Sequence, residues 1–208
     1  MIQAYLHPQS SSAQRVHYFL EHAKIPHKAI KVDLATGEQH KAEYLAVNPF
    51  GVVPAITHDG FSLSESQAIL RYLAQRFELH SQYPANLQDR ARVDQIMDFT
   101  TMHISKHIGS LHWNTIMAPV YKMPSSQVHV DEANKFLLRQ LPKLDRWLAS
   151  QGGFLYGTNH TIADASFVPF VAQMIELKIP IADFYHVGRY AEKITNEAAW
   201  QKVKNASF

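Results

Sequence analysis

The sequence predicts a small α/β domain at the N-terminus, followed by an all-helical domain. In roughly the first 80 residues, short alternating segments typical of strands are interleaved with helical patterns. Everything after residue 87 follows a helical pattern with no convincing strand. Residues 78–87 lie between the two and show no periodic signal, so we interpret them as a linker. The predicted domains therefore cover residues 1–78 and 88–208.

The first domain begins with a predicted βαβ unit. Residues 2–6 alternate and stop before Pro8, which predicts a short strand. Serines 10–12 are candidate N-caps for a helix that ends before Pro26. The apolar positions of that helix are Val16, Phe19, Leu20 and Ala23. Residues 29–34 alternate again, so we expect a second strand parallel to the first, joined by a right-handed crossover.

A predicted ββα unit completes the first domain. Residues 52–57 and 61–63 read as strands joined by a turn at residues 58–60. Residues 64–67 fit the S-x-x-Q capping box, and an amphipathic helix follows over residues 68–77. The order βαβ and then ββα is typical of a thioredoxin-like domain, with a four-stranded mixed sheet and helices on its faces.

The second domain is predicted to consist of helices alone. A long helix is expected over about residues 88–117, and a second over about 131–149 with a kink at Pro142. The T-x-x-D sequence at residues 161–164 predicts a capped third helix that Pro180 stops. Shorter helices fit residues 183–195 and 197–204.

Composition excludes several classes of protein. The 208 residues are 46% hydrophobic with a net charge of +2 and no basic stripe, which argues against a nucleic-acid partner. The chain has no cysteine, which excludes disulfide scaffolds, cysteine nucleophiles, cysteine-bound zinc and CxxC redox motifs. No signal peptide or membrane-length apolar run is visible, so we expect a soluble cytoplasmic protein with no membrane partner. G-x-S-x-G, P-loop and G-x-G-x-x-G motifs are also absent.

Two features of the first domain suggest a binding site beside its sheet. Serines 10–12 lie between a strand and a helix, where a hydroxyl can face a ligand and helix N–H groups add positive potential. Their simpler interpretation is helix capping. Val53-Pro54 is a candidate cis peptide, which would turn the Val53 N–H and C=O toward an extended peptide. The alternative is an ordinary trans proline at the start of a strand.

Two further features suggest what such a site would bind. Glu65 and Ser66 open a helix, where a serine hydroxyl and helix N–H groups can hold a carboxylate and Glu65 can pair with an ammonium. His40 and Lys41 can hold a second carboxylate, although a lone loop histidine is more often merely exposed. These features together suit a γ-glutamyl tripeptide, which is glutathione. They are groups that bind an amino-acid end, a strand edge that pairs with a peptide backbone, a central hydroxyl and a cationic group for a second carboxylate.

Longer stretches of sequence carry a family resemblance. In the first domain these are residues 11–16, 37–40, 48–56 and 64–73. In the second they are residues 91–94, 113–121 and 161–164. On these stretches the chain resembles a cytosolic glutathione S-transferase, serine-type and theta-like, over essentially its whole length. The resemblance implies the glutathione transferase fold, glutathione as co-substrate with no metal, and a homodimer.

The resemblance also implies a catalytic serine. Ser11 would donate a hydrogen bond to the glutathione sulfur, which lowers the thiol pKa and favours the nucleophilic thiolate. The same run is similar to the zeta class, in which Ser10 would take the catalytic place. Ser12 would then stand where that class has cysteine.

The remaining glutathione contacts are implied by position. Val53, followed by Pro54, would pair with the cysteinyl backbone. Glu65 and Ser66 would hold the γ-glutamyl group, and His40 the glycyl carboxylate. The implied activity is conjugation of the glutathione thiolate to small hydrophobic electrophiles in detoxification. The alternatives are a glutathione-dependent dehalogenase or isomerase, or a non-catalytic binding protein on the same scaffold.

Residues of the long predicted helix allow two readings. His103 and His107 have the i, i+4 spacing of zinc ligands, with His112 nearby, but no H-E-x-x-H glutamate accompanies them. We therefore predict no metal site there.

Four apolar residues within or just after the same predicted helix either belong to the core or line a pocket for the electrophile. They are Met102, Trp113, Met117 and Tyr121.

Overall fold

The computed structural model describes residues 1–206 and divides the chain into two compact units. The first unit consists of Met1–Tyr83 together with the segment that begins at Asn196, and the second is Pro84–Thr195. Among the described residues, no helix has both the length and the apolar character needed to span a membrane. The predicted combination of an α/β domain and a helical domain is confirmed.

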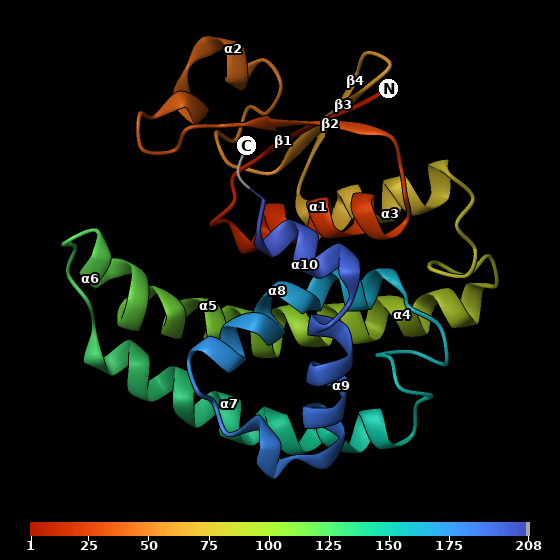
Figure 1. The fold of residues 1–208 in the computed structure, drawn as a ribbon, viewed down its shortest axis with the longest axis vertical. Helices are drawn as coiled ribbons and strands as arrows, with labels where there is room; N and C mark the ends of the chain where they lie inside the picture. Colours follow the sequence, from red (N-terminus) through yellow and green to blue (C-terminus); the bar gives the residue numbers. More distant parts are fainter. Residues whose placement is uncertain (207–208) are drawn as a thin grey trace. The chain divides into compact units, whose positions relative to one another are not determined.

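The sheet of the first unit has four strands in the order β2-β1-β3-β4 (Figure 1). The strands are β1 (Ile2–Leu6), β2 (His27–Lys31), β3 (Ala55–His58) and β4 (Phe61–Ser64). Strands β1 and β2 are parallel, whereas β3 is antiparallel to both β1 and β4. This is the predicted mixed sheet, and β1 has the predicted bounds.

Helices cover both faces of this sheet (Figure 1). Helices α1 (Ser11–His22) and α3 (Ser66–Arg76) pack together on one face. The short helix α2 (Ala42–Leu45) lies on the other face, after a 3₁₀ turn at Glu38–His40. The alternation of β1 buries one set of its side chains completely, and these are Ile2, Ala4 and Leu6.

Two strand boundaries differ from the sequence prediction because tertiary pairing sets them. Strand β2 ends at Lys31, the partner of the last residue of β1, and not at Leu34. The Asp33 carboxylate then accepts hydrogen bonds from following N–H groups and turns the chain. Strand β3 begins at Ala55 and not at Val52, because the preceding residues form an anchored loop.

The prediction of a capping box at residues 64–67 was wrong, because Ser64 does not cap α3. Ser64 is the last residue of β4 and pairs with Ala55, so its backbone is part of the sheet. The residue that caps α3 is Glu65, with φ of 66° and ψ of 106° and no hydrogen bond from its side chain to the helix start. Helix α3 therefore begins without a capping side chain.

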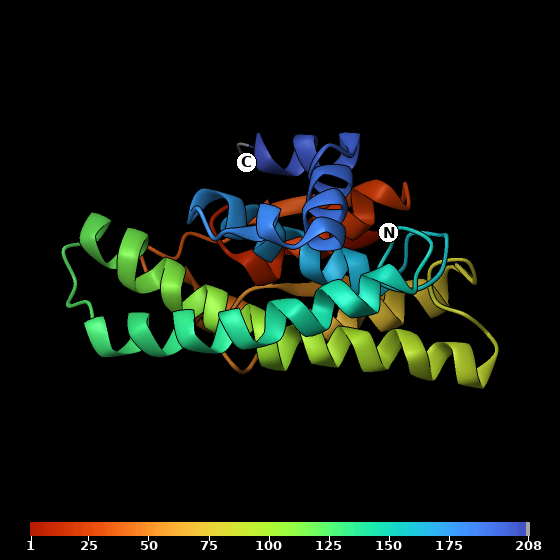
Figure 2. The same cartoon turned by 90° about the horizontal axis from the view of Figure 1, so that it is seen from below.

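The long helix predicted in the second unit is present, with two interruptions. Helices α4 (Leu87–Thr100), α5 (Lys106–His112) and α6 (Ala118–Val120) follow one another directly. They are joined by π-helical segments at Thr101–Ser105 and Trp113–Met117. The next helix, α7, packs along this run (Figure 2).

Helix α7 spans Gln127–Ala149 and continues through Pro142. It begins earlier than predicted because the hydroxyl of Ser126 accepts a hydrogen bond from the His129 N–H. Helix α8 (Ile162–Glu176) has the predicted capping box but ends before Pro180. A 3₁₀ turn and α9 (Tyr185–Thr195) follow.

The last helix, α10 (Ala198–Lys204), groups with the first unit and not with the helical unit. The Tyr18 hydroxyl on α1 donates to the carboxylate of Glu197, and the Tyr18 ring meets the Trp200 ring edge-on at 6.2 Å. The segment from Asn196, which the prediction placed in the domain 88–208, groups instead with the first unit, and α10 packs on α1. Residues 207 and 208, which that prediction also included, lie outside the described residues.

Candidate functional site

The connections that carry the predicted site residues all lie at one end of the sheet. Parallel strands β1 and β2 both finish there, at Leu6 and Lys31. Antiparallel β3 starts there, since Ala55 pairs with both Tyr5 on β1 and Ser64 at the end of β4. The segments that follow β1, β2 and β4 and the segment that precedes β3 are therefore neighbours. The ends of strands in an open α/β sheet are a common location for ligand sites.

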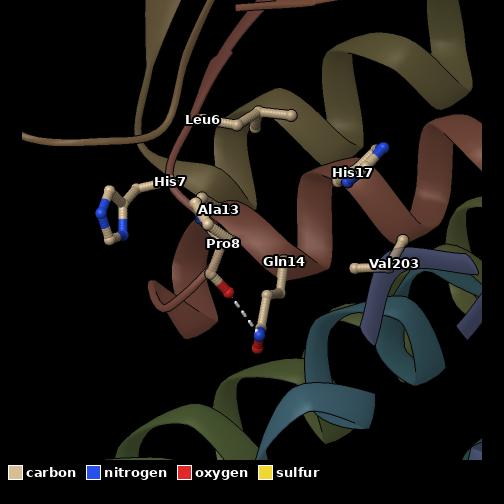
Figure 3. A pocket seen from close by; sticks show the side chains of 7 residues that line it. All are labelled: Leu6, His7, Pro8, Ala13, Gln14, His17 and Val203. Carbon is tan, nitrogen blue, oxygen red and sulfur yellow. Dashed lines mark hydrogen bonds between the residues drawn. The ribbon is translucent and has the colours of Figure 1, made fainter. Parts of the chain in front are cut away.

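The start of α1 gives neighbouring serines different structural roles. Ser10 is the N-cap, and its hydroxyl oxygen accepts a hydrogen bond of 3.3 Å from the Ala13 N–H. Ser11 is the first helical residue and is half-buried. The connection from β1 is held by Gln14, whose side-chain amide donates to the Pro8 carbonyl at 2.7 Å (Figure 3). Sequence reasoning gave Gln14 no role, but it fixes the loop that leads to Ser11.

A small hollow lies beside this connection, between the end of β1, α1 and α10 (Figure 3). Its lining residues are Leu6, His7, Pro8, Ala13, Gln14, His17 and Val203. All of them belong to the first unit. None of the residues predicted to bind glutathione lines it, so this hollow is distinct from the end-of-sheet site.

The Val53-Pro54 peptide is cis, as the sequence suggested. The preceding carbonyl, that of Val52, accepts hydrogen bonds of 2.6 Å from both the Tyr44 hydroxyl and the Asn48 side-chain amide. Burial raises the pKa of Tyr44 to about 12, so its hydroxyl stays a donor at neutral pH. The Tyr44 and Asn48 contacts anchor the loop, and neither was found from the sequence.

The backbone of Val53 is available for a ligand. Its side chain packs against the apolar cluster of Val32, Tyr44 and Ala55. Its N–H and C=O take part in no hydrogen bond within residues 1–206, since the sheet pairing begins at Ala55. An extended peptide can therefore pair with this edge in the manner of an added strand.

His40 lies against the same loop. It ends the 3₁₀ turn and is exposed. Gly51 has φ of 63°, and a Cβ atom at that glycine would lie 3.0 Å from the His40 Nδ1 atom. Only glycine therefore combines this backbone conformation with the close approach of the histidine ring.

The start of α3 carries a charged cluster that includes an arginine. Arg15 on α1 is only 4% exposed, and its Nη1 atom donates to the Ser66 hydroxyl oxygen at 3.2 Å. Burial lowers the pKa of Arg15 to about 10, and the Glu65 carboxylate opposes this shift. The Ser66 hydroxyl accepts from Arg15 and keeps its own O–H to donate. The signal for Arg15 in the sequence was a charge on the apolar face of a helix, four residues after Ser11.

Together these groups match the chemistry of a tripeptide with an amino-acid end. An exposed carboxylate at Glu65 can pair with an ammonium, while the Ser66 hydroxyl and the N–H groups at the start of α3 can bind a carboxylate. The Val53 edge offers backbone hydrogen bonds, and His40 offers a cationic or donor group beside it.

The histidines of the long helix do not form one ligand set in the described chain. His107 stacks on Phe136 with ring centroids 4.6 Å apart, while the His112 Nε2 atom lies 3.2 Å from a carboxylate oxygen of Glu176. The four apolar candidates of the same run are not fully buried, because Met102, Trp113 and Tyr121 are exposed and Met117 is half-buried.

Family models match both units of the chain. The model described as "Glutathione S-transferase, N-terminal domain" matches residues 9–76. The model described as "Glutathione S-transferase, C-terminal domain" matches residues 94–198, which is more than half of the 208 residues.

Relatives with the same name match over nearly the full length. Glutathione S-transferase F10 of Arabidopsis thaliana is 29% identical, over 94% of this chain and 93% of the relative. Glutathione S-transferase theta-2 of Mus musculus is 27% identical, over 97% and 79% of the two chains.

Solved structures agree in fold. Glutathione transferase F2 from Populus trichocarpa superposes with a TM-score of 0.92 at 28% identity, covering 98% of this chain and 97% of its own. A theta-class glutathione S-transferase from Xanthomonas axonopodis pv. citri, solved with glutathione bound, gives 0.88 at 26% identity, covering 99% and 98%.

Proposed function

The chain belongs to the glutathione S-transferase family of enzymes, and from this premise we propose that it conjugates the glutathione thiolate to small hydrophobic electrophiles. The observation that carries the proposal is the meeting of four connections at one end of the sheet. Each connection contributes a group that complements a different part of glutathione. We further propose that the enzyme is serine-type, with Ser11 as its catalytic residue.

The start of α3 binds the γ-glutamyl group in this proposal. Glu65 pairs with the ammonium, and the Ser66 hydroxyl donates to the carboxylate. Arg15 is a positioning residue, because its hydrogen bond to Ser66 orients that hydroxyl. Its charge also interacts favourably with Glu65 and would stabilise the carboxylate of the ligand.

The two remaining contacts hold the rest of the tripeptide. The Val53 N–H and C=O, presented ahead of Pro54, pair with the backbone of the cysteinyl residue. His40, placed beside this loop by Gly51, binds the glycyl carboxylate. The cysteinyl side chain would then point toward the start of α1, because β1 and β3 are neighbouring strands.

Ser11 stabilises the thiolate at that position. Its hydroxyl donates a hydrogen bond to the sulfur, and the positive end of α1 adds to the stabilisation of negative charge. The thiol proton passes to water. The thiolate attacks the electrophilic carbon, a carbon–sulfur bond forms, and the leaving group departs with the bonding electron pair. Ser10 is less suited to this role because its hydroxyl caps α1.

The electrophile, the assembly and the cellular role are proposed on family grounds. Exposed apolar side chains of the second unit would bind the electrophile, and Met102, Trp113, Met117 and Tyr121 are the candidates. A homodimer with a role in detoxification in the cytoplasm follows from the family resemblance. A theta-like subclass stays a prediction, since relatives named F10 and theta-2 have nearly equal identities of 29% and 27%.

Serine replacements test the proposal with matched controls. We expect Ser11→Ala to lower kcat/KM for an aryl halide about 100-fold, the size of effect seen when one hydrogen-bond donor to a developing anion is removed. Ser12→Ala should leave kcat/KM unchanged. Ser10→Ala should keep activity and lower the free energy of unfolding by about 1 kcal/mol, because it removes a helix cap.

Other outcomes distinguish the alternatives. Loss of activity in Ser10→Ala but not in Ser11→Ala would favour the zeta-like assignment. Rearrangement of a substrate with glutathione regenerated and no halide released would indicate an isomerase. Release of halide with glutathione regenerated would indicate a dehalogenase. Glutathione binding without any turnover would indicate a non-catalytic binding protein.

A further inference from the structure

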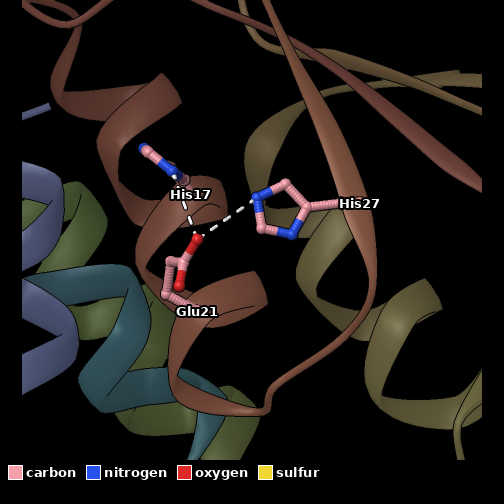
Figure 4. Close-up of side chains that lie close together, drawn as sticks. All are labelled: His17, Glu21 and His27. Carbon is pink, nitrogen blue, oxygen red and sulfur yellow. Dashed lines mark ion pairs between the residues drawn. The ribbon is translucent and has the colours of Figure 1, made fainter. Parts of the chain in front are cut away.

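A compact group of nitrogen and carboxylate ligands lies in the first unit away from the proposed glutathione site (Figure 4). His17 and Glu21 are one turn apart on α1, and His27 is the first residue of β2. The Oε1 atom of Glu21 lies 3.8 Å from His17 Nε2 and 3.5 Å from His27 Nε2. The three ligand atoms all lie within 4.8 Å of one another.

The imidazole of His27 is held in a form suited to metal binding. Its Nδ1 atom lies 2.8 Å from the Ile25 carbonyl oxygen, which can only accept, so Nδ1 carries the proton. The lone pair is then on Nε2, the atom that faces Glu21. A backbone acceptor on the second ring nitrogen is a usual feature of metal-bound histidines.

The His17 ring supplies a second imidazole. Its side chain is buried, and its Nε2 atom lies 3.8 Å from the Oε1 atom of Glu21.

We propose that His17, Glu21 and His27 form a binding site for a divalent transition metal ion, with Zn²⁺ as the preferred ion. Two imidazole nitrogens and one carboxylate oxygen are a common ligand set for zinc with an open fourth position for water. Tetrahedral zinc with bonds of about 2.0–2.1 Å requires ligand atoms about 3.3 Å apart. The two separations that involve Glu21, 3.5 and 3.8 Å, are close to that value, and the separation between the two histidine nitrogens is within 4.8 Å, so binding requires side-chain rotations that bring the three atoms closer.

Lys202 on α10 sets the charge of the site when no metal is bound. Its Nζ atom lies 2.6 Å from the Oε2 atom of Glu21, and its side chain is 67% exposed. The ammonium therefore balances the carboxylate, and its exposure allows it to move into solvent when a cation binds. The competing explanation is a purely structural network in which Lys202 is the permanent partner of Glu21. The two explanations predict different effects of removing Lys202 on zinc affinity.

Zinc titration of the purified full chain without glutathione, followed by calorimetry and thermal melting, tests the site. The wild type should bind one Zn²⁺ per chain with an increase in Tm. His27→Gln should weaken binding about 100-fold, because a ligand is lost. His80→Gln removes an exposed histidine of the same unit and should leave zinc affinity unchanged. Lys202→Gln should tighten binding about threefold, because a repelling and competing charge is removed.

The proposal would be overturned by wild-type protein that binds no zinc, or by equal binding in His27→Gln and His80→Gln. Unchanged or weaker binding in Lys202→Gln would support the structural network instead. X-ray absorption of the zinc-loaded wild type should show two imidazole ligands, and their absence would also contradict the site. None of these readouts depends on catalytic activity, so they are separate from the test of the proposed function.

Discussion

The starts of α3 and α8 carry similar sequences but have different structures. Both have a hydroxyl residue followed three positions later by a residue that can complete a capping box, at Ser64 and at Thr161. At α8 the box forms, and the fully buried Asp164 accepts hydrogen bonds from the Thr161 N–H, the Thr161 hydroxyl and the Leu155 N–H. At α3 no side chain caps the helix, and the backbone of Glu65 has a positive φ of 66°.

The start of α8 is therefore suited to stabilising the fold, whereas the start of α3 is suited to binding a ligand. At α8 the polar groups satisfy one another away from water, so they contribute to stability. At α3 the side chain of Glu65 does not cap the helix and is exposed, so a ligand with complementary charges can bind at this helix start. A non-glycine residue at positive φ costs about 1–3 kcal/mol and is often found at functional sites.

The largest expected effect is on the buried start of α8. Asp164→Ala removes the acceptor of buried donors that include the Leu155 N–H, the Thr161 N–H and the Thr161 hydroxyl, so we expect the free energy of unfolding to fall by about 3 kcal/mol. Urea unfolding of the two proteins measures this change. Ser64→Ala is the control at the corresponding position of α3, and it should change the free energy by less than about 0.5 kcal/mol. Equal losses in both variants would contradict the comparison.

A smaller effect, on binding instead of folding, is expected at α3. Glu65→Gly and Glu65→Ala both remove the carboxylate, so each should weaken glutathione binding about 30-fold in calorimetry. Because glycine tolerates a positive φ, Glu65→Gly should be more stable than Glu65→Ala by about 1 kcal/mol. If Glu65→Gly bound glutathione as the wild type does, Glu65 would not be the ammonium partner.

The smallest effect is a pH dependence of stability from Asp164. Burial raises its pKa from 3.8 to about 6, so the native state binds more protons than the unfolded state between these values. The contribution of Asp164 is therefore greatest at low pH and is lost as pH rises through 6. The free energy of unfolding of the wild type should fall by about 1 kcal/mol from pH 5 to 6.5 relative to Asp164→Asn. Parallel pH profiles of the two proteins would contradict the assigned pKa.

Local patterns in the sequence predicted most of the fold. The alternation of residues 2–6 gave the correct bounds of β1, and the T-x-x-D sequence gave the correct start of α8. The errors occurred where distant residues decide the local structure. Strand β2 stops at Lys31 because its partner strand ends, and Ser64 does not cap α3 because Ala55 holds it in the sheet.

The candidate site was predictable only where its residues are close in sequence or have a recognisable local signal, such as a proline at the start of a strand. The Val53-Pro54 cis bond was foreseen from a proline at a strand start. The hydrogen bond from Arg15 to Ser66 joins residues 51 positions apart, and no periodic pattern encodes such a pair. The contact between His27 and His17 was also missed. The predicted second strand began at residue 29, so His27 was not recognised as part of the strand beside α1.

The most direct test of the proposed function is the thiol pKa of bound glutathione, measured by ultraviolet absorbance of the thiolate across a pH titration. In the wild type and in Ser10→Ala we expect binding to lower the thiol pKa by about 2, because Ser11 donates to the sulfur at the start of α1. In Ser11→Ala most of this lowering should be lost while glutathione still binds. A bound thiol with the same pKa as glutathione in solution, or one lowered equally in Ser11→Ala, would contradict the assignment of Ser11.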